Sequence, residues 1–263
     1  MAAVYFVPLR FTPNAKQICL RQLTGNDELS VEQPSSIDAI LLLDRLLADV
    51  PTGFATPNCS ALQMVTADRD QAMAAIYKNT FGNRISSTIN CAGCSEPFDL
   101  DFLMDDLQAY QASLRNDTEL EQLESGVFRM DDNTVFRLPI GEDEAAVSGM
   151  PRDLAEKQLL SSCMVQGDVA ESGEAVESAM QSIAPMFALD LAAKCPECGL
   201  EQAVHFDVQA YLISAILNRR KQLLRDVHRL ASAYGWSHLE ILSLPSNLRR
   251  VYSSMVASEL EIA

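Results

Sequence analysis

Apolar residues recur every three or four positions in three long stretches of the chain, which is the spacing of an amphipathic helix. The first stretch follows the helix-capping residues Ser35 and Ser36 and precedes Val50-Pro51; its apolar positions are Ile37, Ile40, Leu41, Leu43 and Leu47. The second begins at Asp68 and ends at Gly82, a residue type common at helix C-caps; it carries Met73, Ile76, Tyr77 and Phe81. The third ends at Gly235; it carries Leu212, Ile216, Leu223, Val227, Leu230 and Tyr234.

Shorter segments predict strands, turns and further helices. Strands are expected within residues 4–23, on both sides of two short cysteine turns (85–90 and 98–102, then 188–194 and 203–206), and in a hairpin around Asp131-Asp132-Asn133. Gly25-Asn26-Asp27 predicts a turn, and residues 167–174 predict a loop. Further helices are expected at 103–114, at 151–165 and from the loop to about 187. Ser237-His238-Leu239-Glu240 is a capping box, and Pro245 separates its short helix from a last one.

Together these elements predict an α+β protein in three segments. Residues 1–82 form an N-terminal mixed segment. Residues 83–207 form a zinc-ribbon-like core from two Cys-x-x-Cys knuckles, with the hairpin and helices of 103–187 as a large insertion. Residues 208–263 form a C-terminal helical arm. We interpret the knuckles as two copies of one strand-knuckle-strand unit, because Phe98-Asp99 follows the first and Phe206-Asp207 follows the second.

The composition is that of a folded protein without a membrane span. Hydrophobic residues make up 48% of the chain, which argues against wholesale disorder. No apolar run approaches the ~20 residues that cross a bilayer. The N-terminus lacks the basic and then apolar order of a signal peptide. We therefore expect a soluble cytoplasmic protein with no membrane partner.

Charge is spread unevenly along the chain. The net charge is −16, which disfavours free nucleic acid as a partner because phosphate binding depends on clustered Lys and Arg. Before Tyr211 there are 13 basic and 32 acidic residues, whereas from Tyr211 onward there are seven basic and four acidic ones. This asymmetry suggests an electrostatically distinct C-terminal surface, although ordinary solvated helix faces give the same count.

Four of the seven cysteines form two Cys-x-x-Cys pairs, Cys91 with Cys94 and Cys195 with Cys198. Each turn points both sulfurs to one side, so four thiolates can surround Zn²⁺ at about 2.3 Å. Gly199 permits the tight backbone of the second knuckle. The pairs lie about 100 residues apart, against ~15–20 in a compact ribbon, so the intervening chain would loop out. We predict structural Zn²⁺ on these four ligands, which would contribute to folding.

A vestigial site and a pair of redox dithiols are the alternatives to zinc. Reactive Cys-x-x-Cys pairs usually lie at a helix N-terminus, whereas both pairs here lie between predicted strands. A four-thiolate zinc site also has no open position for water. His205, His228 and His238 are isolated in the sequence, Cys19 and Cys163 lie among apolar residues, and no phosphate loop or nucleophile elbow is present. The sequence therefore predicts no enzyme.

The C-terminal segment contains the only tryptophan, and this residue lies at a predicted helix–helix corner. Trp, Tyr and Arg dominate protein–protein hot spots. We therefore take as candidate partner-binding residues Tyr234, Trp236, Arg249, Arg250 and Tyr252. The structural alternative is that Trp236 packs into the corner.

Several ordered segments resemble the baseplate proteins of T-even-type contractile phage tails and of related bacterial contractile injection systems. In order they are LTGNDE (23–28), ADRD (67–70), TFG (80–82), CAGC (91–94), FRLPIG (136–141), CPEC (195–198), FDV (206–208), LRDVHRLASAYGWS (224–237) and RRVY (249–252). The Trp236-Ser-x-x-Glu-Ile-Leu corner is also similar to phage tail-assembly chaperones.

This resemblance implies a non-enzymatic baseplate or tail-assembly protein that binds the hub, the tube or the tape measure through a zinc-stabilised scaffold. It leaves open whether the chain remains in the finished particle. The alternatives are a zinc-ribbon regulator that contacts nucleic acid or the transcription apparatus, and an oxidoreductase that uses the dithiols.

Overall fold

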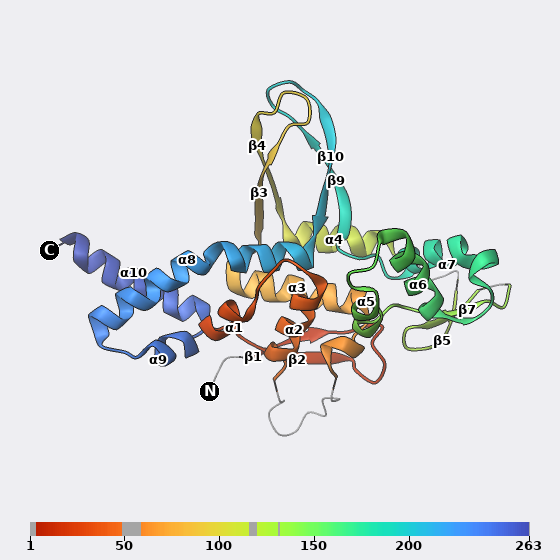
Figure 1. The fold of residues 1–263 in the computed structure, drawn as a ribbon, viewed down its shortest axis with the longest axis horizontal. Coiled ribbons are helices and arrows are strands. Elements are labelled where there is room, and N and C mark those ends of the chain that lie inside the picture. Colours follow the sequence, from red (N-terminus) through yellow and green to blue (C-terminus); the bar gives the residue numbers. More distant parts are fainter. Residues whose placement is uncertain (1–3, 49–58, 116–119, 131, 263) are drawn as a thin grey trace.

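The N-terminal part of the chain forms the centre of the molecule in the computed structural model, which describes residues 4–48, 59–115, 120–130 and 132–262 (Figure 1). Its elements are β1 (Val4–Pro8), β2 (Gln17–Arg21), α1 (Gly25–Ser30), α2 (Ser36–Leu46), the 3-10 helix η1 (Ala61–Gln63) and α3 (Thr66–Phe81). β1 and β2 pair antiparallel, and α3 packs against the long helix α8 (Val208–Tyr234). The predicted start of the first helix at Ser35 and the predicted end of the second at Gly82 are confirmed. Val50-Pro51, the predicted end of the first helix, lies outside the described residues.

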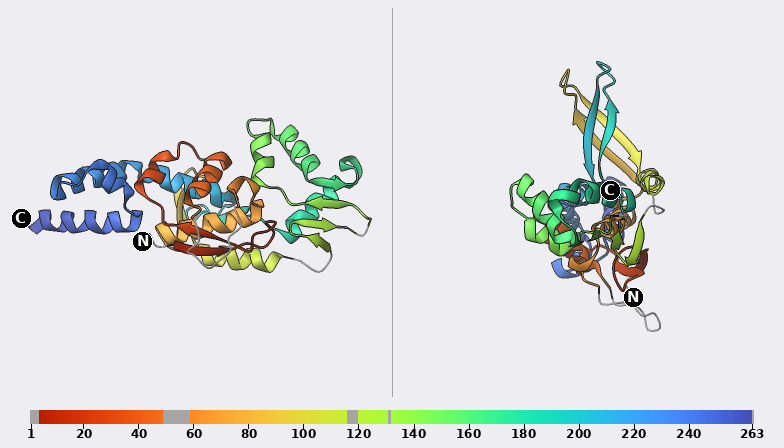
Figure 2. Two further views of the ribbon diagram at one scale, coloured as in Figure 1. Left: turned by 90° about the horizontal axis from the view of Figure 1, so that it is seen from below. Right: turned by 90° about the vertical axis from the view of Figure 1, so that its right-hand side faces the viewer.

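Two hairpins project together from this centre (Figures 1 and 2). One pairs β3 (Arg84–Asn90) with β4 (Pro97–Leu103), and the other pairs β9 (Ala188–Lys194) with β10 (Glu201–Asp207). A helix follows each hairpin: α4 (Met104–Leu114) after the first and α8 after the second. These helices leave the base of the hairpins in opposite directions (Figure 1).

The two ends of the long axis are built differently (Figures 1 and 2). One end, which we call the lobe, has an antiparallel sheet and three helices: β5 (Glu121–Glu124), β6 (Val127–Arg129), β7 (Val135–Arg137), α5 (Gly141–Val147), α6 (Arg152–Cys163), β8 (Met164–Gln166) and α7 (Val169–Ile183). The other end, which we call the arm, contains the distal part of α8 from residue 218, with α9 (His238–Ser243) and α10 (Ser246–Ile262).

The main hydrophobic core lies beneath the hairpins, not between the cysteines. It joins α2, α3 and the first half of α8, and the bases of the hairpins contribute Ile85, Phe206 and, just before β9, Phe187. This confirms a mixed helix and strand fold, and it places the knuckles away from the main core. The core takes side chains from all three predicted segments; the segment boundaries themselves stay a prediction.

Three local predictions were wrong, two on helix boundaries and one on the equivalence of the two Phe-Asp pairs. Residues 25–27 start helix α1 instead of a turn, because the Asp27 carboxylate accepts the N–H and the hydroxyl of Thr24 and so satisfies the helix start. The predicted loop at 167–174 already belongs to α7 from Val169, where the Asp168 side chain caps the Ala170 N–H. Helix α5 was not predicted.

The third correction concerns the two Phe-Asp pairs, which are not equivalent. Phe98 lies four residues after its knuckle, whereas Phe206 lies eight residues after its own. In the hairpins Phe98 is therefore near the tip, and Phe206 is at the base. The true counterpart of Phe206 is Phe102, whose ring lies against it at a centroid distance of 5.2 Å.

The short helices α1 and α5 begin in the same way. In each, an Asp in the first turn accepts hydrogen bonds from both terminal nitrogens of an Arg six residues earlier. Arg21 donates to Asp27 at 2.6 and 2.8 Å, and Arg137 donates to Asp143 at 2.6 and 2.7 Å. Both arginines lower the pKa of their Asp partner, against the effect of burial. The shared pattern is Arg-x-x-x-Gly-x-Asp-Glu.

The Glu that ends this pattern pairs with a buried Arg from a distant helix, and we call the arrangement a clasp. In the first clasp, Arg249 Nη2 on α10 lies 2.6 Å from Glu28 Oε1 on α1, and both side chains are buried. Ser246, at the start of α10, donates its N–H to Leu23 O at 2.8 Å and its hydroxyl to Glu28. The first clasp therefore fixes the arm to the centre.

The second clasp repeats these contacts between α3 and α5. Arg69 is fully buried and pairs with Glu144, and Thr66 donates its hydroxyl to the same carboxylate oxygen at 2.5 Å. The Thr66 N–H donates to Pro139 O at 3.0 Å, as Ser246 does in the first clasp. The second clasp therefore fixes the lobe to the centre.

A glycine is required at the fourth position after the first Arg of each pattern. A Cβ added at Gly25 would lie 2.7 Å from Leu242 Cδ2 and 2.9 Å from Arg249 Nη1. One at Gly141 would lie 2.8 Å from Ala61 O and 3.0 Å from Arg69 Nη1. The glycine thus leaves room both for a packed neighbour and for the guanidinium of the clasp.

Replacement of Arg249 by Met should destabilise the protein by about 3–5 kcal/mol, because it leaves the Glu28 carboxylate buried and unpaired. Arg225→Met, on the exposed face of α8, should change the free energy of unfolding by less than about 0.5 kcal/mol. Chemical denaturation of both variants measures this. Equal small effects would show that the clasp does not hold the arm. A double variant that also carries Glu28→Gln should lose less than the sum of the two single losses.

Candidate metal centre

The tip of the paired hairpins brings four cysteines together. Cys91 and Cys94 lie in the turn after β3, and Cys195 and Cys198 lie in the turn after β9. Their Sγ atoms all lie within 4.8 Å of one another. In the described part of the chain this is the one group of three or more Cys, His, Asp or Glu side chains close enough to share a metal ion.

The sulfur spacing fits a tetrahedral metal. Cys91 Sγ lies 3.5 Å from Cys198 Sγ, and Cys94 Sγ lies 3.7 Å from Cys195 Sγ. Four sulfurs at about 2.3 Å from a central ion are about 3.8 Å apart, whereas a disulfide needs about 2.05 Å. All four cysteines are free. Both short distances run between the hairpins, so an ion here would link them.

The two knuckles have the same backbone. In each, the residue after the second Cys donates its N–H to the carbonyl of the first Cys: Ser95 to Cys91 at 2.9 Å and Gly199 to Cys195 at 3.0 Å. Both residues have positive φ, +65° at Ser95 and +75° at Gly199. The second knuckle therefore has glycine where the left-handed conformation favours it, whereas the first has a serine there. Gly93, inside the first turn, is not the left-handed residue.

Backbone N–H groups favour the thiolate at Cys91. The amides of Cys94 and Gly93 lower the pKa of Cys91 to about 6, and the Gly93 nitrogen lies 3.3 Å from its Sγ. The thiolate is the form that binds a metal. Cys91 and Cys195 are buried, whereas Cys94 and Cys198 are exposed.

Few other contacts join the hairpins at the tip. A small apolar cluster beneath the cysteines contains Phe98 and Ala193, with Ile89, Leu100 and Val204 at its margin. The side chain of Gln202 accepts the Ala92 N–H at 2.8 Å and donates to Asn90 O at 3.3 Å, which connects one hairpin to the other. A bound ion would therefore be the strongest link at this end.

Four thiolates of this spacing suit a structural ion, because they fill every position of a tetrahedron. The donor set also selects a thiophilic metal such as zinc. Such a site has no ligand position left to activate water or substrate. What it can do is close a loop of about 100 residues and add its binding free energy to folding.

The predicted partner-binding aromatics form one cluster on the arm. The Trp236 ring lies 4.9 Å from that of Tyr234 and 5.2 Å from that of Tyr252, centroid to centroid. Tyr234 is exposed, and the other two are half-buried against the arm's own core of α8, α9 and α10. These rings are thus both a packing element and a partly open surface, and their docking role stays a prediction.

The two predicted arginines lie outside this aromatic cluster, and both bond to other parts of the protein. Arg249 is buried in the first clasp, so its side chain does not reach the surface. Arg250 donates from Nη2 to Thr80 O at 2.6 Å and so joins α10 to the end of α3. The clasp residues Glu28, Glu144 and Arg69 were missed from the sequence. The signal for the two glutamates was the repeated Arg-x-x-x-Gly-x-Asp-Glu pattern, and the signal for Arg69 was the Ser/Thr-x-x-Arg spacing that it shares with Arg249.

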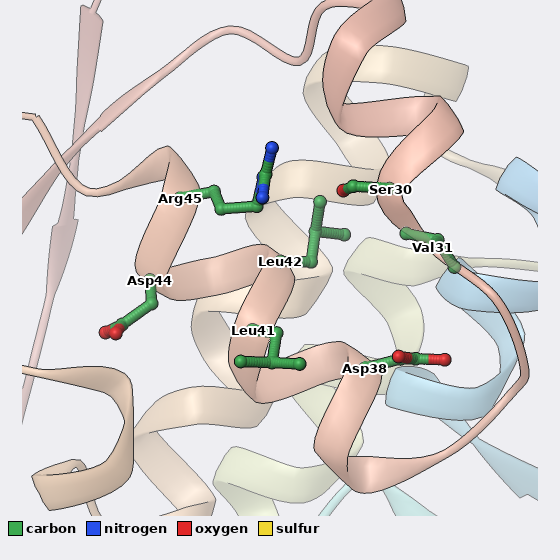
Figure 3. Close-up of a pocket in the computed structure, with 7 residues that line it drawn as sticks. All are labelled: Ser30, Val31, Asp38, Leu41, Leu42, Asp44 and Arg45. Carbon is green, nitrogen blue, oxygen red and sulfur yellow. The ribbon is translucent and has the colours of Figure 1, made fainter.

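A surface hollow between the end of α1 and α2 is shown in Figure 3; its lining is Ser30, Val31, Asp38, Leu41, Leu42, Asp44 and Arg45. Its two carboxylates, Asp38 and Asp44, point in different directions, and each accepts a hydrogen bond from a backbone N–H. Asp38 accepts the Gln33 N–H, and Asp44 accepts the Ala61 N–H, both at 2.7 Å. The hollow therefore presents no pair of groups arranged for acid–base chemistry.

None of the helices in the described ranges is both long enough and apolar enough to cross a membrane. Comparisons with protein-family models, with curated proteins and with solved structures found no match to this chain.

The cysteine cluster should bind one metal ion per chain. Titration with Co²⁺, monitored by its thiolate absorption bands and followed by displacement with Zn²⁺, should saturate at one equivalent. Cys195→Ser should weaken binding because it removes one of four ligands, whereas Cys59→Ser, outside the cluster, should leave stoichiometry and affinity unchanged. Equal binding by both variants would contradict the site.

Acid should release the ion, since protons compete for the thiolates. In the metal-free chain, the lowered pKa of Cys91 stabilises the folded state. This stabilisation is complete at pH values above the pKa of the unfolded chain's cysteine, about 8.5. That contribution is lost as the pH falls through about 6.

Proposed function

We propose that this chain is a non-enzymatic assembly protein of a contractile phage-like tail or injection system, with structural Zn²⁺ on Cys91, Cys94, Cys195 and Cys198. The two knuckles act as a zinc ribbon split by a large insertion. The zinc-stabilised scaffold binds other baseplate or tail components: hub, tube or tape measure. The chain works in the cytoplasm, where such particles are built.

The four-thiolate cluster is the observation that carries this proposal. It supports a structural role because its donors would all be used for one ion and because it lies at the tip of projecting hairpins. None of the four cysteines lines the hollow of Figure 3. The order of sequence segments described above supports the choice of contractile tails among structural proteins. The long insertion between the knuckles is consistent with that resemblance.

The surface of the arm also supports a binding role. Leu248, Val251 and Met255 are 40%, 53% and 51% exposed, and they lie on one face of α10 at spacings of three and four. Leu239 on α9 is 72% exposed. Apolar side chains gathered on one exposed face are typical of protein–protein contact sites. This face replaces Arg249 as the candidate contact surface.

Affinity purification of a tagged full chain, from cells that produce the particles, should recover tail or baseplate proteins identified by mass spectrometry. Val251→Glu with Met255→Glu should reduce this recovery at least tenfold, because charges on the exposed face oppose apolar contact. A matched control, Ser232→Glu on the exposed side of α8, should recover the same proteins as the unmodified chain.

Two results would contradict the proposal. Recovery of RNA polymerase or nucleic acid in place of tail proteins would favour the zinc-ribbon regulator. Thiol–disulfide exchange activity that zinc suppresses would favour the oxidoreductase. The protein content of purified particles then separates a permanent component, present in the particle, from a transient assembly factor.

A further inference from the structure

The arm presents a basic stripe with a leucine at its centre. Lys221, Leu224, Arg225 and His228 lie at i, i+3, i+4 and i+7 on α8, and all four are exposed. The opposite face of α8 carries Leu223 and the other buried residues that pack against α9 and α10. The stripe therefore faces away from the arm's own core and has no covering element within the described chain.

The lobe has the opposite charge. Residues 141–183 contain nine acidic and two basic residues, and the acids that α6 and α7 expose include Asp153, Glu171, Glu174 and Glu177. Exposed apolar side chains lie among them, since Leu154 and Val165 are each 59% exposed. One of the basic residues, Arg152, is already paired with Glu156 at 2.7 Å. The lobe surface therefore carries exposed apolar side chains among acidic ones.

The positions of these two surfaces decide how they can meet. They lie at opposite ends of the long axis (Figures 1 and 2), so they cannot pair within one chain. Two lobes would repel each other, as would two basic stripes. The remaining pairing places the lobe of one chain on the arm of another, with opposite charges around apolar contacts.

We infer that the chain associates with itself head to tail, with the acidic α6–α7 face of one copy on the Lys221–His228 stripe of the next. Such contacts are heterologous: each copy keeps one free lobe and one free arm, so association continues until a ring closes or a filament grows. The inference concerns the chain alone and does not rest on the proposed tail function. Salt should weaken the contact, because exposed charges are screened over about 10 Å at 0.1 M ionic strength.

The test uses sedimentation velocity of purified full-length chain and two variants. The arm variant carries Leu224→Glu and Arg225→Glu, and the lobe variant carries Leu154→Ser and Glu174→Ser, so the two altered faces do not attract each other. The unmodified chain should increase in mean mass with concentration and decrease with added salt. Each variant alone should remain monomeric. An equimolar mixture should form a complex of two chains and grow no further, because it contains one intact lobe and one intact arm per pair.

A charge reversal away from both ends, Lys16→Glu, should leave self-association intact. Circular dichroism and metal content per chain should match the unmodified protein in every variant, which separates loss of contact from loss of fold. A monomer at all concentrations would overturn the inference. So would a lobe variant that still pairs with itself, since that result indicates like-to-like contact through the arm. A mixture that stays monomeric would overturn it as well.

Discussion

Two buried arginine–glutamate clasps determine where both ends of the molecule lie. Arg249 with Glu28 holds the arm, and Arg69 with Glu144 holds the lobe. Taking these charges out of water is costly, and in the described chain Nη1 of each arginine has no hydrogen-bond partner. The clasps are therefore better explained as devices that specify position than as large net contributors to stability.

The four-cysteine cluster, like the two clasps, is built from both halves of the chain. Each half supplies one Arg-x-x-x-Gly-x-Asp-Glu segment, one helix that starts with Ser or Thr and has Arg three residues later, and one cysteine knuckle. Each clasp joins parts from different halves, and the four-cysteine cluster takes two ligands from each. Neither half completes any of these three sites by itself. A two-stranded hairpin is also marginal alone, so the tip depends on what joins its hairpins.

Sequence reasoning located the elements whose signals are local. The helix that ends at Gly235 and both knuckles follow from spacing, caps and turn residues within windows of up to about 18 positions. The clasps join residues separated by up to 221 positions, and no local pattern states which Arg meets which Glu. Arg249 was therefore assigned to the surface, because its neighbours in sequence suggested a docking segment. Residues 25–27 have turn composition, yet Asp27 satisfies the helix start and overrides it.

Hydrogen–deuterium exchange of the full chain, with and without bound metal, tests whether an ion holds the two hairpins together above the core. Above their bases the two hairpins lie outside the main core, so a bound ion would be their strongest link. Metal removal should therefore speed amide exchange in residues 86–101 and 190–205 and leave α3 and the first half of α8 protected. Unchanged protection at the hairpins would contradict a structural metal, and loss of protection throughout the molecule would contradict a core that folds beneath them.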